Sequence, residues 1–363
     1  MHASDAALAR LVDQVDDARA QRRPLEIRGG VTKRFYGEAP AGTPLDVTEL
    51  SGISSYEPTE LVVTARAGTR LDELEAALEE HGQRLPFEPP RFAPGGTVGG
   101  MVAAGLSGPA RASVGSVRDH VLGITLLNGR SEVLTFGGQV SKNVAGYDVS
   151  RLLVGSLGIL GVICEVSMKV LPASVATTTL TFDWNEQQTL ETLCRWGGQP
   201  WPINATAWHA DRLYLRLAGA RAAVATACER LGGERMETSA AHAWWLAVRD
   251  QSAAFFTLDA ASLAHGESLW RLSVPPAAPA LVLPGQQFIE WSGAQRWWRS
   301  AAPAAEIRDA AARVGGHATL IHGADRTGVF APLNSVLMRV HRGLKKAFDP
   351  DGIFNPGRLY AGL

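Results

Sequence analysis

The 363-residue sequence predicts an α+β protein made of two sheet-and-helix parts and a C-terminal segment. Two observations support this prediction. Glycine-rich turns recur beside strands in the first half, where the missing Cβ lets the backbone approach a neighbouring group closely. After Pro172 the order becomes strand, helix, hairpin, helix, which is typical of a second, smaller α+β unit. We expect the parts at residues 1–172, 173–300 and 301–363.

Composition narrows the class of protein. The 35 basic and 36 acidic residues balance, so no basic field favours nucleic acid or an anionic membrane. The three cysteines, Cys164, Cys194 and Cys228, are far apart, which argues against an iron–sulfur cluster, a c-type haem or a zinc site and fits a reducing compartment. The N-terminus has no apolar leader, and no run approaches 18 apolar residues. We expect a cytoplasmic protein without a membrane span, associated with a membrane only through partners.

Apolar spacing predicts the elements of the first part. Residues 6–19 read as a helix and residues 25–28 as a short strand. Strands at 43–50 and 61–67 precede a helix that starts at Thr69 as N-cap and ends near Gly82.

The next stretch predicts a hairpin and a final strand. Residues 121–127 alternate apolar and polar, Asn128-Gly129 is a strong hairpin turn, and residues 132–136 form the return strand. A short helix at 149–153 then leads into a strand at 162–170.

The same patterns organise the rest of the chain. Strands and helices are expected in the order strand, helix, hairpin, helix at 175–182, 186–196, 205–217 and 221–231. The tail reads as a helix, a strand and a helix at 304–314, 317–321 and 333–348.

Three glycine-rich turns stand beside these strands, at residues 29–33, 95–100 and 155–161. Consecutive backbone N–H groups with a nearby lysine suit a phosphate group. The first turn alone also fits an ordinary turn, and none of the three matches a Walker A loop or a Rossmann fingerprint. Together they predict that the chain binds one large phosphate-bearing cofactor.

Four segments carry a family resemblance: GGMVAAGLSGPARASVGSVRDHVLG, FGGQVSKNVAGYDVSRLLVGS, GGHAT and FDPDGIFNPGRLY. They are similar to the vanillyl-alcohol-oxidase (PCMH-type) FAD-binding superfamily and, more narrowly, to the FAD-binding E-type subunits of bacterial glycolate oxidase. The resemblance implies a two-part FAD-binding domain at 1–172, an α+β cap domain at 173–300 and a segment at 301–363 that returns to the FAD domain.

The resemblance also implies where FAD lies. Its pyrophosphate and ribityl chain would follow the first two turns, and two further segments would flank the adenine end and its linkage. The residues expected at the cofactor are Arg28, Gly29, Gly30, Val31, Thr32, Lys33, Gly96, Thr97, Val98, Gly99, Gly100, Gly115, Ser116, Val117, Ser156, Gly158, Gly161, Val162 and Ile163. Flavin-linking relatives place a histidine in the first turn, and this chain has none between Arg28 and Lys33, so we expect non-covalent FAD.

The sequence departs from the family pattern at two turns. Val31 stands where many relatives have a third glycine, which predicts a stiffer or narrower first turn. In the third turn two polar side chains of the family are replaced in Leu157-Gly158-Ile159-Leu160-Gly161, so backbone contacts would carry more of the binding.

No catalytic residue and no metal ligand is assigned. The histidine cluster of related 2-hydroxy-acid dehydrogenases is missing, and His317 and His322 fall on opposite faces of a strand, which favours structural roles. Lys142 and Tyr147 are candidates to hydrogen-bond the flavin or an anionic substrate. Arg118 and Arg326 are isolated candidates.

Two surfaces have open interpretations. The basic row Arg339, Arg342 and Lys346 on the last helix, beside His341, is either a solvated face or a site for a carboxylate or an acidic partner. The pairs Trp244-Trp245 and Trp297-Trp298 are either core packing or first candidates for an apolar docking surface.

Two functional hypotheses follow. In the first, the chain takes part in oxidising a small 2-hydroxy acid such as glycolate to glyoxylate, as an FAD-dependent oxidoreductase subunit active only within a complex. In the second, it is a non-catalytic flavin-binding assembly subunit. The resemblance implies a larger FAD-binding subunit and an iron–sulfur subunit as partners.

Overall fold

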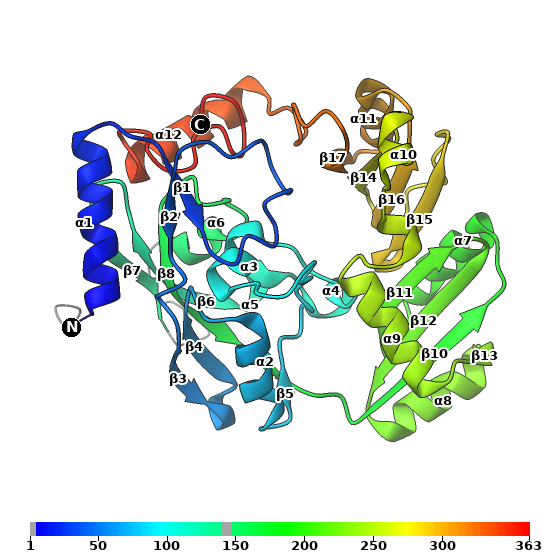
Figure 1. The fold of residues 1–363 in the computed structure, drawn as a ribbon. Coiled ribbons are helices and arrows are strands. Elements are labelled where there is room, and N and C mark those ends of the chain that lie inside the picture. The colour runs from blue at the N-terminus through cyan, green and yellow to red at the C-terminus, as the bar shows by residue number, and fades with distance from the viewer. Residues whose placement is uncertain (1–4, 139–146) are drawn as a thin grey trace.

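The computed structural model describes residues 5–138 and 147–363. Figure 1 shows two parts side by side, with the C-terminal helix lying over the first of them. The first part contains a five-stranded antiparallel sheet in the order β3-β4-β8-β6-β7. Its strands are β3 (Ile53–Glu57), β4 (Val62–Arg66), β6 (Val121–Leu127), β7 (Val133–Gly137) and β8 (Val162–Lys169).

Short helices cover this sheet because their apolar residues join its core. Leu74 of α2, Val102 of α3 and Leu153 of α6 are buried in one cluster with Ile124 and Val166 of the sheet. The elements around them are η1 (Pro58–Glu60), α2 (Leu71–Glu79), β5 (Gln83–Arg84), α3 (Val98–Ala104), α4 (Arg111–Val114), α5 (Val117–His120), α6 (Val149–Leu153) and β9 (Leu171–Pro172).

The expected cap of α2 is wrong by one residue. Its N-cap is Arg70, which makes no side-chain capping bond. The Thr69 hydroxyl is used elsewhere, since it lies 3.0 Å from both the N and the O of Gly52. The hairpin predicted at Asn128-Gly129 is confirmed as the turn between β6 and β7.

A smaller unit flanks the sheet. Strand β1 (Leu25–Arg28) pairs in parallel with β2 (Thr43–Asp46), and α1 (Ala6–Ala20) buries Leu11 and Val15 beside them. Phe354, near the C-terminus, makes a parallel bridge to Leu25 on the other edge of β1. The chain end is thereby fastened to the strand that enters the first glycine turn.

The second part is one eight-stranded sheet in the order β13-β10-β12-β11-β15-β16-β14-β17, in which the paired strands run antiparallel. Its strands are β10 (Ala176–Phe182), β11 (Ile203–His209), β12 (Arg212–Gly219), β13 (Glu234–Arg235), β14 (Ser268–Ser273), β15 (Gln286–Glu290), β16 (Gln295–Ser300) and β17 (His317–His322).

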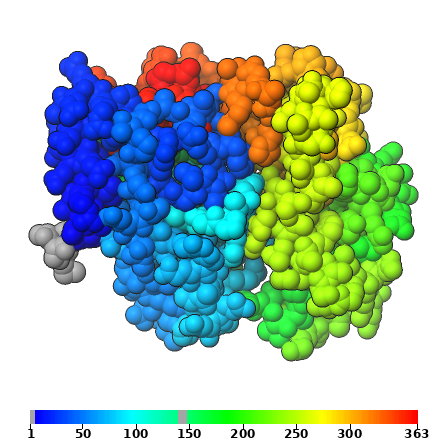
Figure 2. Space-filling view, in the orientation of Figure 1, coloured from blue at the N-terminus to red at the C-terminus, as the bar shows by residue number. Residues whose placement is uncertain are grey.

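Helices lie on both faces of the second sheet. One face is covered by α7 (Glu186–Gly197), α8 (Arg221–Leu231) and α11 (Ala304–Arg313). The other carries α9 (Thr238–Arg249), η2 (Ala254–Phe256) and α10 (Ala260–Ala264), and η3 (Trp291–Gly293) joins β15 to β16. Figure 2 shows the yellow-green α9 region pressed against the cyan segment of the first part.

The core interpretation of the tryptophan pairs is confirmed, and their proposed docking surface is wrong. Trp297 and Trp298 are both buried on opposite faces of β16, since neighbouring side chains of a strand alternate. Trp245 is buried as well, and the half-buried Trp244 stacks on Tyr214 with ring centroids 3.9 Å apart.

The second sheet extends past the expected boundary at residue 300. Strand β17 pairs with β14, and α11 packs its Ile307 and Ala311 on the same sheet, so residues 304–322 belong with the second part. The return to the first part begins after β17 and includes α12 (Ser335–Phe348). The added strand pairs with the backbone N–H and C=O groups on the edge of β14, which would otherwise be left unpaired.

Candidate functional site

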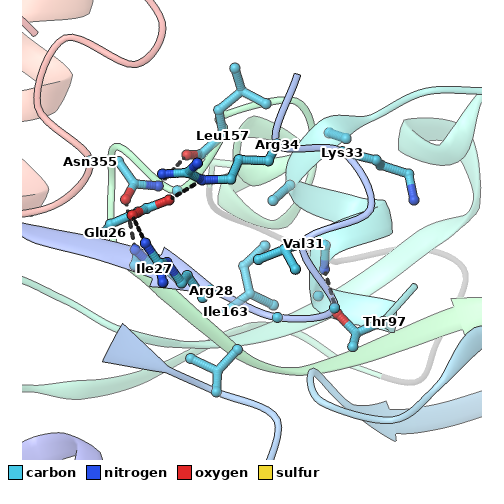
Figure 3. Close-up of a pocket in the computed structure, with 18 of the residues that line it drawn as sticks. Glu26, Ile27, Arg28, Val31, Lys33, Arg34, Thr97, Leu157, Ile163 and Asn355 are labelled. Atoms are coloured by element: carbon cyan, nitrogen blue, oxygen red, sulfur yellow. Dashed lines mark hydrogen bonds and ion pairs between the residues drawn. The ribbon is translucent and has the colours of Figure 1, made fainter. Parts of the chain in front are cut away.

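A cleft with about 890 Å³ of open space lies in the first part, between the first glycine turn, α3 and the third glycine turn. Figure 3 shows this cleft with Val31, Thr97 and Ile163 around it. Every described residue that lines it belongs to residues 26–163 or to the C-terminal pair Asn355 and Arg358.

The structure brings together most of the residues expected at the cofactor. Those that line the cleft are Arg28, Gly29, Gly30, Val31, Thr32, Lys33, Thr97, Gly99, Gly100, Gly158, Gly161 and Ile163. Those that do not are Gly96, Val98, Gly115, Ser116, Val117, Ser156 and Val162.

The first turn presents free backbone donors. From Gly29 to Lys33 no backbone N–H donates a hydrogen bond within the described part of the chain. A row of such donors is the arrangement that holds an anion. Gly30 is required for the turn itself, because a Cβ there would overlap the carbonyl oxygen of Gly95 in the second turn.

Val31 adopts a conformation that suits glycine better. Its φ is +48°, in the left-handed region, and its side chain is exposed at the rim of the cleft. A β-branched residue held there costs about 1–3 kcal/mol. Val31 therefore carries backbone strain that a glycine would not, and the expected stiffening of the turn stays a prediction.

The second turn starts α3, whose N-cap Thr97 accepts a hydrogen bond from the Gly100 N–H at 3.3 Å. The two glycines after it differ in what they face. A Cβ on Gly99 would lie 2.7 Å from the Cβ of Ala67 in the protein core. A Cβ on Gly100 would meet only the Thr97 hydroxyl, at 3.2 Å, and Gly100 lines the cleft. A Cβ on Gly99 would therefore meet protein atoms first, whereas a Cβ on Gly100 would enter the cleft.

The closing NPGR segment holds the backbone beside the first and third glycine turns in place. The Asn355 side chain accepts from the Ile27 N–H at 2.8 Å and donates to the Leu157 carbonyl at 2.7 Å. Arg358 donates to the carbonyls of Arg34 at 2.8 Å and Tyr36 at 2.6 Å, and to that of Glu38. The chain end thus fixes the backbone on both sides of the cleft.

Sequence reasoning missed these clamping residues, together with Glu26 and Arg34 at the cleft wall. The buried Glu26 carboxylate accepts from Arg28 at 2.5 Å and from Arg34 at 3.0 Å, as Figure 3 shows. Burial opposes ionisation of Glu26, but the two arginines outweigh it and lower its pKa. The NPGR motif was the available signal, since it is a conspicuous polar run that follows the last predicted helix.

Lys33 brings a cation to the cleft without an ion pair among the described residues. Its Nζ lies 3.4 Å from the Thr32 hydroxyl and 5.8 Å from the centre of the Phe92 ring. Burial lowers the pKa of Lys33 to about 8, and the carboxylate of Asp250 only partly opposes this. A phosphate group bound at the turn would relieve this penalty, so the donor set fits a phosphate-bearing cofactor.

The Gly115 turn has a structural role of its own. Ser116 is the N-cap of α5 and shares a capping box with Asp119, whose carboxylate accepts from the Ser116 N–H at 2.7 Å. Val117 is buried in the core of the first part. These bonds account for the Gly-Ser-Val sequence without a ligand.

The remaining candidates lie away from the cleft or outside the described residues. Lys142 is in the latter group, and Tyr147 is 98% exposed and does not line the cleft. Arg326 donates to the carbonyls of Phe35 and Gly37, and His322 stacks on the Phe35 ring at 4.5 Å.

Two further expected candidates also have no place at the cleft. His317 is exposed at the start of β17, and Arg118 is exposed in α5. Neither side chain lines the cleft, and the expected structural role of the histidine pair stays a prediction. Within residues 5–138 and 147–363 no three His, Cys, Asp or Glu side chains gather as a metal site would require. No helix in those ranges is both long and apolar enough to cross a membrane.

Two family models match the chain. Residues 6–137 match the FAD binding domain, and residues 290–359 match the C-terminal domain of FAD linked oxidases. The glycolate oxidase subunit GlcE of Escherichia coli (strain K12) is 46% identical over 97% of this chain and 97% of its own length.

More distant relatives match less than half of the chain. The D-lactate dehydrogenase of Anaerostipes hadrus is 34% identical over 38% of this chain and 29% of its own length. The glycolate oxidase subunit GlcD of Bacillus subtilis (strain 168) is 30% identical over 44% of this chain and 34% of its own length. Among solved structures, an alkyldihydroxyacetonephosphate synthase superposes with a TM-score of 0.64 at 14% identity, covering 95% of this chain and 75% of that one. The expected PCMH-type fold and the FAD cofactor are thereby confirmed.

Proposed function

Because the chain belongs to the family of the glycolate oxidase subunit GlcE, we propose that it is the FAD-binding subunit of a multi-subunit glycolate oxidase. It would take part in oxidising glycolate to glyoxylate and would work in the cytoplasm. The observation that carries this proposal is the cleft itself, where five consecutive free N–H groups stand beside the unpaired Lys33.

The residues of the cleft suggest how FAD is held. The N–H groups of residues 29–33 and the Lys33 ammonium would bind the pyrophosphate. Gly100 and the backbone at 158–163 would lie against the rest of the cofactor, where a side chain would leave no room. Asn355 and Arg358 are positioning residues, since their side chains hydrogen-bond to backbone atoms on the two sides of the cleft. When bound, FAD supplies hydride or electron transfer.

We propose two partners: a larger FAD-binding subunit and an iron–sulfur subunit. The GlcE relative is by name one subunit of an oxidase, which supports assembly of this chain with others. The three described cysteines are free and far apart in the sequence, and Cys164 and Cys228 are buried. Electrons leaving the flavin would therefore pass to an iron–sulfur cluster on another chain.

A second candidate function, a non-catalytic assembly subunit, has an observation in its favour. Next to the cleft, the space between the two parts is filled by buried aromatic side chains, among them Tyr36, Trp245, Phe288 and Trp297. The described lining of the cleft contains no residue of the second sheet. A substrate beside the cleft would therefore need this aromatic cluster to open.

The surface that best suits a partner is the outer face of α12. Val336, Leu337 and Val340 are 57%, 46% and 53% exposed there. Arg339 and Arg342 on the same helix form no ion pair with any described residue. An apolar stripe beside unpaired cations complements an acidic protein surface, so we propose this face as the docking site of a partner subunit.

The function is tested by following flavin bleaching by glycolate without oxygen. We expect the chain alone to be bleached negligibly and the reconstituted complex to be bleached rapidly, with activity towards an artificial acceptor only in the complex. Comparable rates for the single chain would contradict the need for partners. To separate the two candidate functions, this chain is reconstituted as a variant that assembles but lacks FAD. Full activity of that complex would favour the assembly role.

A further inference from the structure

A second cavity lies between the two parts, beside β5 and the start of α9. It holds about 1210 Å³ of open space and shares no lining residue with the FAD cleft. Figure 1 shows β5 at the lower edge of the first part, opposite β10, β13 and α9 of the second. Arg84 and Glu88 line it from the first part, and Arg216, Arg235 and His242 from the second.

The cavity has more positive than negative charge. Its three arginines face one carboxylate, that of Glu88. Glu88 is already engaged, because it accepts from Arg216 at 2.6 Å and from the Ala110 N–H at 2.9 Å. Arg84 and Arg235 form no hydrogen bond or ion pair through their side chains with the described part of the chain.

Arg84 is the more informative of the two free cations. It is half-buried at the end of β5, and burial together with the nearby Arg216 lowers its pKa, although Glu88 opposes this. A guanidinium stays charged in such a place, so its lost hydration is unbalanced until an anion arrives. The site therefore favours a negatively charged ligand.

The neighbouring Arg216 is held rigidly. Its Nε donates to Asn204 at 2.6 Å, and its guanidinium lies 4.8 Å from the centre of the Trp245 ring. Trp245 is itself fixed by a hydrogen bond to the Thr179 hydroxyl at 2.9 Å. This wall of the cavity is therefore ordered before a ligand binds, and only the Arg84 and Arg235 side chains lose conformational freedom on binding.

We propose that this cavity binds the phosphate group of a small metabolite, with Arg84 and Arg235 as its ligands from opposite parts. Guanidinium groups match phosphate oxygens in pairs. Thr178 and Thr238 line the same cavity and add hydroxyl donors for a third oxygen. A carboxylate has two oxygens and would leave these donors unused. The bound phosphate joins the two parts and holds them in one arrangement.

The experiment titrates FAD-loaded protein with inorganic phosphate and, separately, with glycerol 3-phosphate, at constant ionic strength. Calorimetry and thermal unfolding are the measurements. We expect saturable binding with a rise in the unfolding temperature. Arg84→Gln should weaken binding at least tenfold, whereas Arg313→Gln, an exposed arginine on α11, should bind like the wild type.

Arg235→Gln tests the same site from the second part of the molecule. Because Arg235 is exposed at the rim of the cavity, its replacement leaves the core intact. It too should weaken phosphate binding, with FAD content unchanged in every variant. The proposal would be overturned if the wild type showed no saturable binding of either phosphate probe. It would also be overturned if Arg84→Gln and Arg235→Gln both bound phosphate as tightly as the wild type. Binding of citrate in preference to both probes would overturn the phosphate assignment as well.

Discussion

At the scale of single residues, the cleft depends on backbone access and on one half-buried cation, Lys33. Gly30 and Gly100 show two different reasons for glycine. Gly30 lets two turns of the protein touch, whereas Gly100 leaves space open in the cleft. Lys33 is the only described lysine that lines the cleft, and its low pKa reflects a charge that the protein leaves without a partner.

The pH dependence of FAD binding tests the role of Lys33. Without FAD its pKa is about 8, and a bound pyrophosphate would raise it, so binding takes up a proton above pH 8. Affinity should therefore fall as pH rises above about 8, by up to roughly tenfold per pH unit. Fluorescence titration of FAD at pH 6.5 to 9.5 measures this. Lys33→Met should bind more weakly at pH 7 and lose the slope, while Lys169→Met should keep it; an unchanged slope in Lys33→Met would exclude the assignment.

The adjacent glycines of α3 give a matched pair. Gly100→Val should fold normally and bind FAD at least roughly tenfold more weakly, since its side chain would enter the cleft. Gly99→Val should lose about 1–3 kcal/mol of unfolding free energy, because its side chain meets Ala67. Thermal unfolding and the ratio of flavin to protein absorbance separate the two effects. Full flavin occupancy in Gly100→Val would place the cofactor elsewhere.

At the scale of elements, α12 stands apart because Lys345 is its only buried residue. The Lys345 ammonium donates to Asp349 and to the carbonyls of Ile159 and Phe354, each at 2.7 Å. These bonds anchor the helix from one side and leave its apolar outer stripe to solvent. A helix with such a face is normally covered by another element or by a partner.

Charge reversal on α12 tests the docking face. Arg339→Glu with Arg342→Glu should reduce association with the larger subunit at least roughly tenfold, mainly through repulsion of an acidic surface. FAD content should stay unchanged, since neither arginine lines the cleft. Gel filtration of the mixed subunits at two salt concentrations gives the result, with Arg313→Glu on α11 as control. Normal assembly of the double variant would remove α12 from the interface.

At the scale of the whole molecule, the cleft is assembled from distant segments. Residues 26–34, 97–104, 157–163 and 355–358 meet there, and the NPGR segment is tied to the first strand by Asn355 and Phe354. A ligand that binds all of these segments stabilises the entire first part by mass action.

Acid release tests the non-covalent binding of FAD, and thermal unfolding tests whether FAD stabilises the first part. We expect the flavin in the supernatant after acid precipitation. Gently stripped protein should unfold at a lower temperature, and FAD at about 100 times its Kd should restore about 2.7 kcal/mol of stability. Differential scanning calorimetry follows the shift. Yellow colour retained in the acid pellet would instead show a covalent bond.

The sequence by itself determined the α+β class, most strands and helices, and the three glycine turns, because these follow from local spacing and from the missing Cβ. The family resemblance identified the cofactor as FAD. Only the tertiary structure decided that Gly99 faces the protein, that β17 belongs to the second sheet and that Trp245, Trp297 and Trp298 are buried. It also brought Asn355 and Arg358 to the cleft and placed Arg84 and Arg235 on the walls of one cavity. These facts depend on which distant segments pack together, and periodicity along the chain carries no such information.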